Sequence, residues 1–283
     1  MDRLLVVAFL TAIIHLTDTL VYAVRFSGVT TKRLATAFSL FQIISLLAST
    51  ANLIQAPLLS SVVEQTILSS LPAGGHDVLL RHLNHQIRLV ILSATAGTLA
   101  GVLFTPLFIY VFTKVIFLFE EAGSIPRLFL MLISPRWLFL VISKRSLLPG
   151  RLSSRLPARP GGFSGRNIPP AFLVANVLII GIWTTGVLSA LYAGALIPDY
   201  RSTASLLSGV VNGLATILSA VIVDPTAATI TDQALRGERS QGDVKQMVHY
   251  LCLTRILGTF LAQLLFLPAA YLIKFCALFM VGL

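Results

Sequence analysis

Long apolar runs place the strongest constraint on what this chain can fold into. Six of them reach the ~20 residues that an α-helix needs to cross the hydrocarbon core of a bilayer. The chain is 56% hydrophobic and 11% charged, whereas a soluble domain carries roughly 25% charged residues. We therefore expect an all-α polytopic membrane protein. The expected spans are 4–24, 34–59, 89–119, 171–197, 202–223 and 248–281.

Part of the sequence is repeated. Residues 100–110 resemble residues 262–271, and Gly97-Thr98 upstream of the first copy has a counterpart in Gly258-Thr259. Further landmarks recur in the same order: Tyr22 and Tyr192, then Pro57 and Pro225. Copies of three spans each would have opposite orientations, so the duplication predicts a 3+3 inverted repeat. That architecture is typical of transporters whose substrate site lies between the halves. Shared membrane composition is the alternative explanation.

The segment between the copies predicts how the chain is divided. Residues 144–170 are rich in Pro, Gly, Ser and Arg, as in a flexible linker. We therefore expect a first repeat over 1–143 and a second over 171–283. Residues 125–142 are apolar but contain two arginines and two prolines. A spanning helix would bury one arginine near its centre, so an interfacial helix is expected there.

The net charge of +10 is concentrated in one segment. Eight basic residues and no acidic one lie between Ala122 and Pro170. Nucleic-acid binding would explain a basic chain, but basic loops mark the cytoplasmic side of membrane proteins, and we expect no nucleic-acid partner. The remaining interpretation is attraction of an anionic substrate to that surface. With a basic turn at 25–33 and six spans, residues 60–88, 198–201 and both termini should lie outside, and residues 224–245 should form a cytoplasmic loop.

Polar residues inside the spans are the candidate binding residues, because such groups at membrane depth are costly and usually face a cavity or a partner. His15, Asp18, Tyr22 and Arg25 follow spacings of three, four and three residues, which keep them on one helical face. We expect this stripe to line a hydrophilic cavity, with Arg25 at its mouth for an anionic group. His15 and Asp18 are a candidate proton relay. The alternative is an internal network that fixes the first span in the bundle.

Further polar residues repeat at helical spacing in the second and fifth spans. Asn52, Gln55 and Asn212 are candidate substrate contacts, although small polar groups also hold membrane helices together. Asp224 and Asp232 lie at the inner end of the fifth span. For Asp224, a cap or an interfacial salt bridge is the simpler role.

Arg88 and Arg255 begin the third and sixth spans and take similar places in the two copies. In an inverted pair they would lie near opposite membrane faces. That placement would suit the passage of a phosphate from one side to the other, because arginine binds phosphate bidentately. Snorkelling toward headgroups is the alternative, and it is the better interpretation for Arg88, at the edge of a span.

Motifs for an enzyme or an ATP-driven motor are absent from the sequence. It contains no Gly-x4-Gly-Lys-Ser/Thr loop and no Gly-x-Ser-x-Gly elbow, and its histidines show no metal-ligand framework. We expect no cofactor, no metal, and transport driven by a gradient or by the membrane potential. Cys252 and Cys276 would lie about 36 Å apart on one helix, too far to form a disulfide, and we interpret them as apolar fillers.

Several segments carry a family resemblance: Ile14–Arg25, Thr50–Pro57, Arg166–Pro169, Gly186–Gly194, Asn212–Leu218, Asp224-Pro225 and Thr231-Asp232. In these segments the chain resembles the alternate lipid II flippase family, Amj, and the resemblance covers essentially its whole length. The family usually has an arginine shortly before Thr50, where this chain has Ser49. If that arginine contacts pyrophosphate, this chain must use another base.

The resemblance implies a flippase that moves lipid II, the undecaprenyl-pyrophosphate-linked disaccharide pentapeptide, across the bacterial cytoplasmic membrane for cell-wall synthesis. It implies lipid II and membrane lipids as partners, and alternating access without ATP. Two alternatives stay open. One is an intramembrane enzyme acting on polyprenyl pyrophosphates, and the other is an ion-coupled small-solute transporter.

Overall fold

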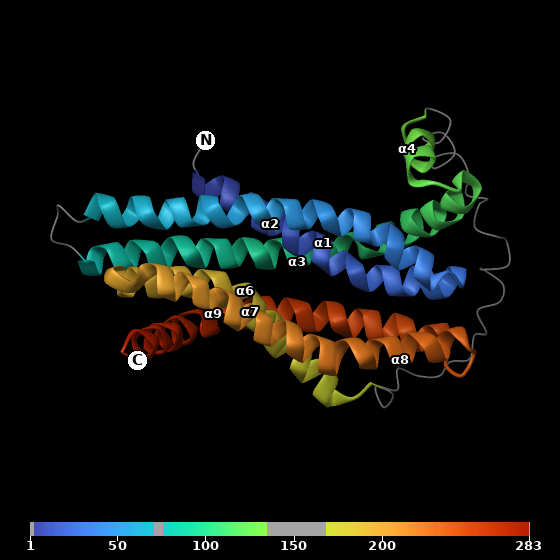
Figure 1. Cartoon of the computed structure of the whole chain (residues 1–283). Coiled ribbons are helices and arrows are strands. Elements are labelled where there is room, and N and C mark those ends of the chain that lie inside the picture. Colours follow the sequence, from blue (N-terminus) through green and yellow to red (C-terminus); the bar gives the residue numbers. More distant parts are fainter. Residues whose placement is uncertain (1–2, 71–75, 135–167, 283) are drawn as a thin grey trace.

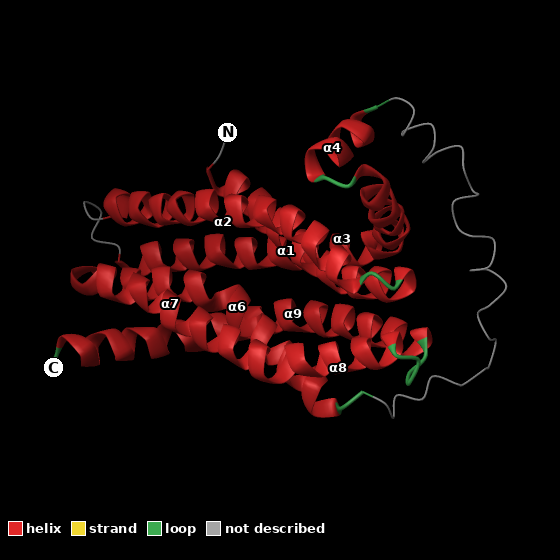
Figure 2. Ribbon diagram, turned by 45° about the vertical axis from the view of Figure 1, so that its right-hand side comes forward, coloured by secondary structure: helices red, strands yellow, loops and turns green. Residues whose placement is uncertain are grey.

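A computed structural model describes residues 3–70, 76–134 and 168–282 of the chain, which are almost entirely helical and include no strand (Figure 2). Within this part of the chain, six segments are long and apolar enough to cross a membrane. Hydrocarbon offers no hydrogen-bond partner to backbone polar groups, and a helix satisfies them within its own segment. The chain is therefore a polytopic α-helical membrane protein, which confirms the fold class predicted from the apolar runs.

Among the described residues, the six spans follow one another along the chain, and the short helix α4 comes after the third. The first half contains α1 (Arg3–Thr31), α2 (Leu34–Ser70), α3 (His76–Ala122) and the short α4 (Ile125–Ile133). The second half contains α6 (Pro170–Leu196), the 3₁₀ turn η3 (Pro198–Tyr200), α7 (Arg201–Leu218), the π-helical turn η4 (Ser219–Val223), α8 (Asp224–Leu235) and α9 (Gln241–Val281). The segment from η3 to α8 forms the fifth span.

Several helices extend beyond the predicted spans. α2 continues through Pro57 to Ser70 and α3 begins at His76, so most of the segment 60–88, which the predicted spans leave out, is helical. α8 continues the fifth span past Pro225, and the predicted loop at 224–245 is reduced to a short turn. These predictions were wrong because they took proline as a helix end. Membrane helices tolerate proline where the freed backbone groups are satisfied locally, and both prolines face outward, away from the packed core.

Local capping signals end α8 and start α9. Gly237 has a φ of +80°, and the N–H of Glu238 donates to the carbonyl oxygen of Gln233 at 2.9 Å, which closes α8 as in a Schellman motif. α9 then begins with a capping box, because Ser240 Oγ accepts from the Asp243 N–H at 3.2 Å and Asp243 Oδ2 accepts from the Ser240 N–H at 3.0 Å. These contacts restrict the connection between the two helices to a tight turn.

The six spans run along one long axis of the molecule, and α4 stands to one side of them (Figure 1). The α1–α2 turn, the C-terminal end of α3 and the α8–α9 turn lie at one end, and the α6–α7 turn and the C-terminus lie at the other. The first of these ends includes the basic turn at 25–33. The positive-inside rule assigns it to the cytoplasm, and this orientation stays a prediction.

The two halves share a packing arrangement. α1 packs against α2 and α3, whereas α6 packs against α7 and α9, and the corresponding helices run in opposite directions (Figure 1). Gly97 of α3 lies directly against the backbone of Ala12 in α1. Gly258 of α9 lies in close contact with Val177 and Ile180 of α6. A 3+3 inverted repeat would produce this arrangement, and the repeat stays a prediction.

The segment after α3 is described in part. α4 ends at Ile133, and its Leu128 belongs to an apolar cluster with α3, whereas Phe129 and Leu130 are exposed. Such an amphipathic helix fits a membrane surface, and its interfacial role stays a prediction. The rest of 125–142 and most of the linker at 144–170 lie outside the described residues, so the division into 1–143, 144–170 and 171–283 is also still a prediction.

Candidate functional site

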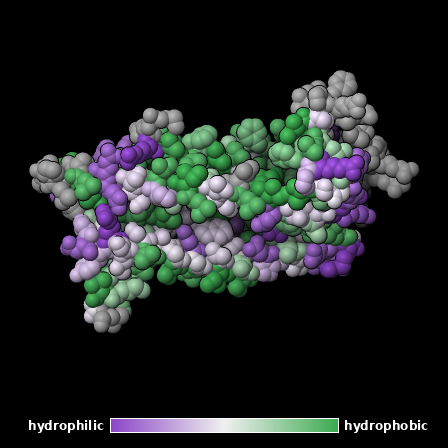
Figure 3. Space-filling model, turned by 45° about the horizontal axis from the view of Figure 1, so that its top comes forward, coloured by the Kyte–Doolittle hydropathy of each residue, from purple (hydrophilic) through white to green (hydrophobic). Residues whose placement is uncertain are grey.

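A cavity of about 390 Å³ lies between the two halves of the bundle. All six spans contribute to its wall, and purple and pale residues reach the surface midway along the molecule between green, hydrophobic margins (Figure 3). Its polar lining residues are Thr11, His15, Asp18, Ser45, Ser49, Asn52, Gln55, Trp183, Thr184, Asn212 and Arg255. A polar cavity within apolar spans is what a membrane protein needs to hold a hydrophilic group.

The cavity collects residues that are far apart in the sequence. Six of the predicted site residues line it: His15, Asp18, Asn52, Gln55, Asn212 and Arg255. They lie on α1, α2, α7 and α9. The remaining candidates are not among the lining residues, and each has a different environment. They are Tyr22, Arg25, Arg88, Asp224 and Asp232.

The charge in the cavity belongs to an ion pair between its two halves. Arg255 Nη2 of α9 lies 3.1 Å from Asp18 Oδ2 of α1. The Arg255 side chain is 6% exposed and that of Asp18 is 47% exposed, so the guanidinium is set into the wall and the carboxylate reaches into the cavity. Tyr22 also contacts Arg255, which gives it a supporting place behind the wall. A guanidinium buried at this depth requires an anionic partner, and Asp18 provides one.

Three buried polar atoms on lining residues have no hydrogen-bond partner among the described residues. They are His15 Nδ1, Asn212 Oδ1 and Arg255 Nε. Buried polar atoms in folded proteins are nearly always paired. These three residues therefore leave part of the hydrogen-bonding capacity of the cavity wall unused in this arrangement.

α2 presents the polar stripe that its spacing predicted. Ser45, Ser49 and Asn52 line the cavity, and Gln55 Nε2 donates to Thr11 Oγ1 of α1. Ser49 stands where the family resemblance leads us to expect an arginine. Arg255 lines the same cavity and is the basic side chain that it offers to an anion.

Sequence reasoning named no individual residue of α6 as part of the cavity wall. Trp183 and Thr184 line the cavity, and Trp183 Nε1–H donates to Thr216 Oγ1 of α7 at 3.3 Å. The apolar residues of α6 show no preference for one side of the helix, so no pattern distinguished its cavity face. The position of Trp183 along the span could have identified it. Tryptophan usually occupies membrane interfaces, whereas Trp183 lies in the middle of the helix.

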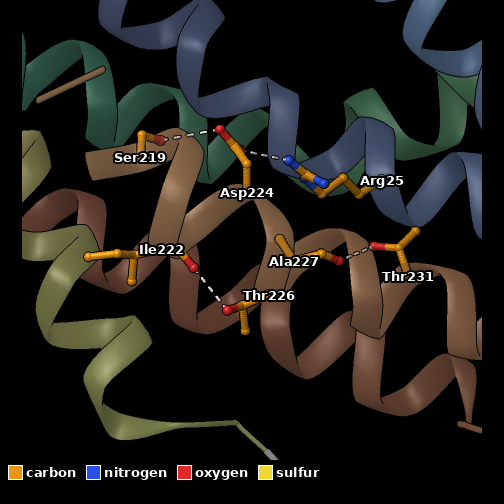
Figure 4. Close-up of polar contacts among 7 residues, drawn as sticks. All are labelled: Arg25, Ser219, Ile222, Asp224, Thr226, Ala227 and Thr231. Atoms are coloured by element: carbon orange, nitrogen blue, oxygen red, sulfur yellow. Dashed lines mark hydrogen bonds and ion pairs between the residues drawn. The ribbon is translucent and has the colours of Figure 1, made fainter. Parts of the chain in front are cut away.

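A second ion pair joins the halves beside η4. Arg25 Nη2 lies 3.2 Å from Asp224 Oδ1, and Ser219 Oγ donates to Asp224 Oδ2 at 3.4 Å (Figure 4). The Arg25 guanidinium also lies 5.3 Å from the centre of the Phe38 ring, within cation–π range. The salt bridge considered for Asp224 is therefore present, and a direct role for Arg25 toward an anion stays a prediction.

Arg88 links α3 to α9 instead of reaching a headgroup. Its Nη1 donates to the carbonyl oxygen of Gln263 at 3.0 Å, and Gln263 Nε2 donates to the carbonyl oxygen of Arg88 at 3.0 Å. Because α3 begins at His76, Arg88 lies inside the helix, and the snorkelling interpretation is wrong. The two arginines are also not equivalent, since Arg88 precedes Gly97 by nine residues and Arg255 precedes Gly258 by three. Asp232 is exposed on α8.

Comparison with known proteins identifies the family. The model of a family described as "Amj: Alternate to MurJ" matches residues 10–277. This chain belongs to the Amj family. One Amj relative, named lipid II flippase Amj, comes from Bacillus subtilis (strain 168) and is 35% identical over 262 residues, which cover 92% of this chain and 91% of the relative. No solved structure matches the chain. The resemblance to Amj inferred from the sequence is confirmed.

Proposed function

We propose that this chain is a lipid II flippase of the bacterial cytoplasmic membrane. Its family and the name of its relative support this function. The observation that carries it is the ion pair between Asp18 and Arg255 on the wall of a polar cavity between two sets of spans. The pair holds a cation at membrane depth in a form that an anionic headgroup can engage.

The pyrophosphate of lipid II supplies the chemistry that Arg255 requires. Phosphate oxygens accept hydrogen bonds from a guanidinium in a bidentate geometry, and such charge-assisted bonds are strong where water is scarce. Arg255 Nε is buried without a partner among the described residues, while Nη2 is held by Asp18. We infer that the pyrophosphate binds Arg255 and displaces Asp18 from it.

The lipid tail would stay in the bilayer during transport. α2 and α7 flank the cavity, and among the described residues they do not form an extensive interface with each other. Their outer surfaces are apolar, with Leu53 on α2 and Leu206 on α7 exposed over three quarters of their surface or more. A headgroup in the cavity could thus remain attached to a tail that lies between these helices in lipid.

Translocation requires the cavity to change shape. Small-molecule pockets span roughly 300–1,000 Å³, and about 390 Å³ lies near the lower limit, although the headgroup of lipid II carries two sugars and a peptide. We propose that the two halves rock about the cavity in alternating access without ATP. The ion pair between Arg25 and Asp224 would open on one side, and the pair between Arg201 and Glu64, 3.6 Å apart, on the other.

Complementation tests this function in cells. The chain is expressed in a bacterium depleted of its lipid II flippases, and lipid II accessible at the outer surface of spheroplasts is measured. We expect restored growth and surface lipid II with the wild-type chain, and transport defects with Asp18→Ala and Arg25→Ala at normal expression. Wild-type behaviour of both variants would refute the proposed site. Phosphate release by the purified protein would favour an enzyme on polyprenyl pyrophosphates, and uptake insensitive to lipid-linked substrates would favour a solute carrier.

A further inference from the structure

Trp183 has an unusual position for a tryptophan in a membrane helix. It lies midway between Pro170 and Leu196, the ends of α6, whereas tryptophan is enriched at the two membrane–water interfaces. Its side chain is not packed into the core, because the residue is 38% exposed and lines the cavity. Interfacial anchoring and core packing therefore both fail to account for it.

The indole ring is held in a defined orientation. Its Nε1–H donates to Thr216 Oγ1 at 3.3 Å, and Thr216 Oγ1 donates in turn to the carbonyl oxygen of Asn212, one turn earlier on α7. The hydrogen bond ties the polar edge of the ring to α7, and Trp183 is at the same time part of the cavity wall. A rigid aromatic surface loses little conformational entropy when a ligand binds to it.

The groups around Trp183 suit a carbohydrate. Asn212 shares the cavity wall, and its carboxamide is packed against Gly186 of α6 through Oδ1. Gly186 explains its position, because a Cβ at 186 would occupy the space of the Asn212 carboxamide. Asn52 contributes a second amide from α2. Binding sites for polar ligands combine an aromatic surface with a few placed hydrogen-bonding groups, and a sugar ring has apolar C–H bonds on its faces and hydroxyl groups around its edge.

We propose that Trp183, with Asn212 and Asn52, forms a carbohydrate subsite in which the face of a sugar ring stacks on the indole. The C–H hydrogens on the face of the sugar carry a slight positive charge, and they meet the negative face of the indole ring. The subsite rests on the proposed function, and it implies that the substrate binds in the cavity in one orientation. The pyrophosphate lies toward Arg255, and the sugars lie toward α6 and α7. Trp183 then determines specificity for the glycosylated lipid over the bare carrier.

A pair of ligands that differ by the sugar and peptide tests this subsite. The affinities of the purified full chain for lipid II and for undecaprenyl pyrophosphate are measured in lipid nanodiscs. Trp183→Leu should weaken lipid II binding about tenfold, a change of roughly 1.4 kcal/mol, and leave the affinity for undecaprenyl pyrophosphate within about twofold. Trp183→Phe keeps an aromatic surface and should lose less. Phe260→Leu, on the exposed face of α9, is the matched control and should change neither affinity.

The outcomes separate the subsite from the function. Unchanged lipid II binding by Trp183→Leu, or equal losses for both ligands, would overturn the subsite and leave the flippase function standing. Failure of the wild-type chain to bind either ligand would overturn both.

Fluorescence gives a second measurement that does not depend on the folding of the Trp183 variants. The chain has two tryptophans, so Trp137→Phe leaves Trp183 as the reporter. We expect a saturable change of its emission with lipid II and none with undecaprenyl pyrophosphate. The same response to both ligands would contradict stacking by the sugar.

Discussion

At the scale of residues, Asp18 and Arg255 combine a structural role with a binding role. Removal of one partner from a fully buried ion pair costs about 3–5 kcal/mol, because the other charge is left uncompensated. Here the two partners differ, since Arg255 is 6% exposed and Asp18 is 47% exposed. Loss of the carboxylate should therefore destabilise the fold more than loss of the guanidinium, because the exposed carboxylate can be solvated in the cavity.

Neutralising variants separate these two roles. Asp18→Asn should lower the thermal stability of the purified protein, by less than the ~3–5 kcal/mol of a fully buried pair. The double variant Asp18→Asn with Arg255→Gln should recover much of that stability, because no buried charge remains unpaired. Lipid II transport should be lost with Arg255→Gln and with the double variant, since both lack the cation. Thermal melts and surface lipid II are the two measurements, and transport by a stable Arg255→Gln protein would refute the binding role.

At the scale of elements, the fifth span is an interrupted helix. η4 changes the hydrogen-bonding register between α7 and α8, and Pro225 follows it directly. π-turns are frequent at functional sites, and proline removes a backbone donor from the helix. Asp224 lies at this break and is bonded to both Arg25 and Ser219 (Figure 4). Movement of α8 relative to α7 would therefore be controlled by the ion pair to α1.

Exchange of the two charges tests whether the ion pair between Arg25 and Asp224 controls this movement. Arg25→Asp and Asp224→Arg, each alone, place like charges together and should reduce transport by about tenfold or more. The two changes combined restore opposite charges at the same positions and should recover part of the transport. Surface lipid II at matched protein levels is the measurement. A double variant no better than either single variant would show that the pair does not act as a unit.

The crossing of α1 and α3 depends on glycine. A Cβ at Gly97 would overlap the backbone of Ala12, whereas one at Gly209 on α7 would meet nothing within 4 Å. Gly97→Ala should therefore destabilise the protein by at least the roughly 1–3 kcal/mol typical of overpacking. Gly209→Ala should be neutral or slightly stabilising, because alanine is the better helix former. Thermal melts of the two variants compare the same chemical change, and equal melting temperatures would contradict the close approach of α1 and α3.

At the scale of the whole molecule, the sequence predicted what depends on local pattern. Apolar run length identified six spans, and the spacing of His15 and Asp18 identified the cavity face of α1. Local sequence pattern could not identify which helices meet. The pairing of Asp18 with Arg255 and of Arg88 with Gln263 therefore required the structure. Trp183 was missed for the same reason, because α6 has no amphipathic pattern and its cavity side is defined by its neighbours.

Direct transport by the purified protein tests the central claim that lipid II crosses the membrane through this cavity. The full chain is reconstituted in liposomes that contain fluorescent lipid II, and the fraction reached by an external quencher is followed over time. We predict faster exchange than in protein-free liposomes, a loss of that acceleration with Arg255→Gln, and a normal rate with Gly209→Ala. No acceleration by the wild-type chain would contradict the flippase function, and an undiminished rate with Arg255→Gln would contradict the route through the cavity.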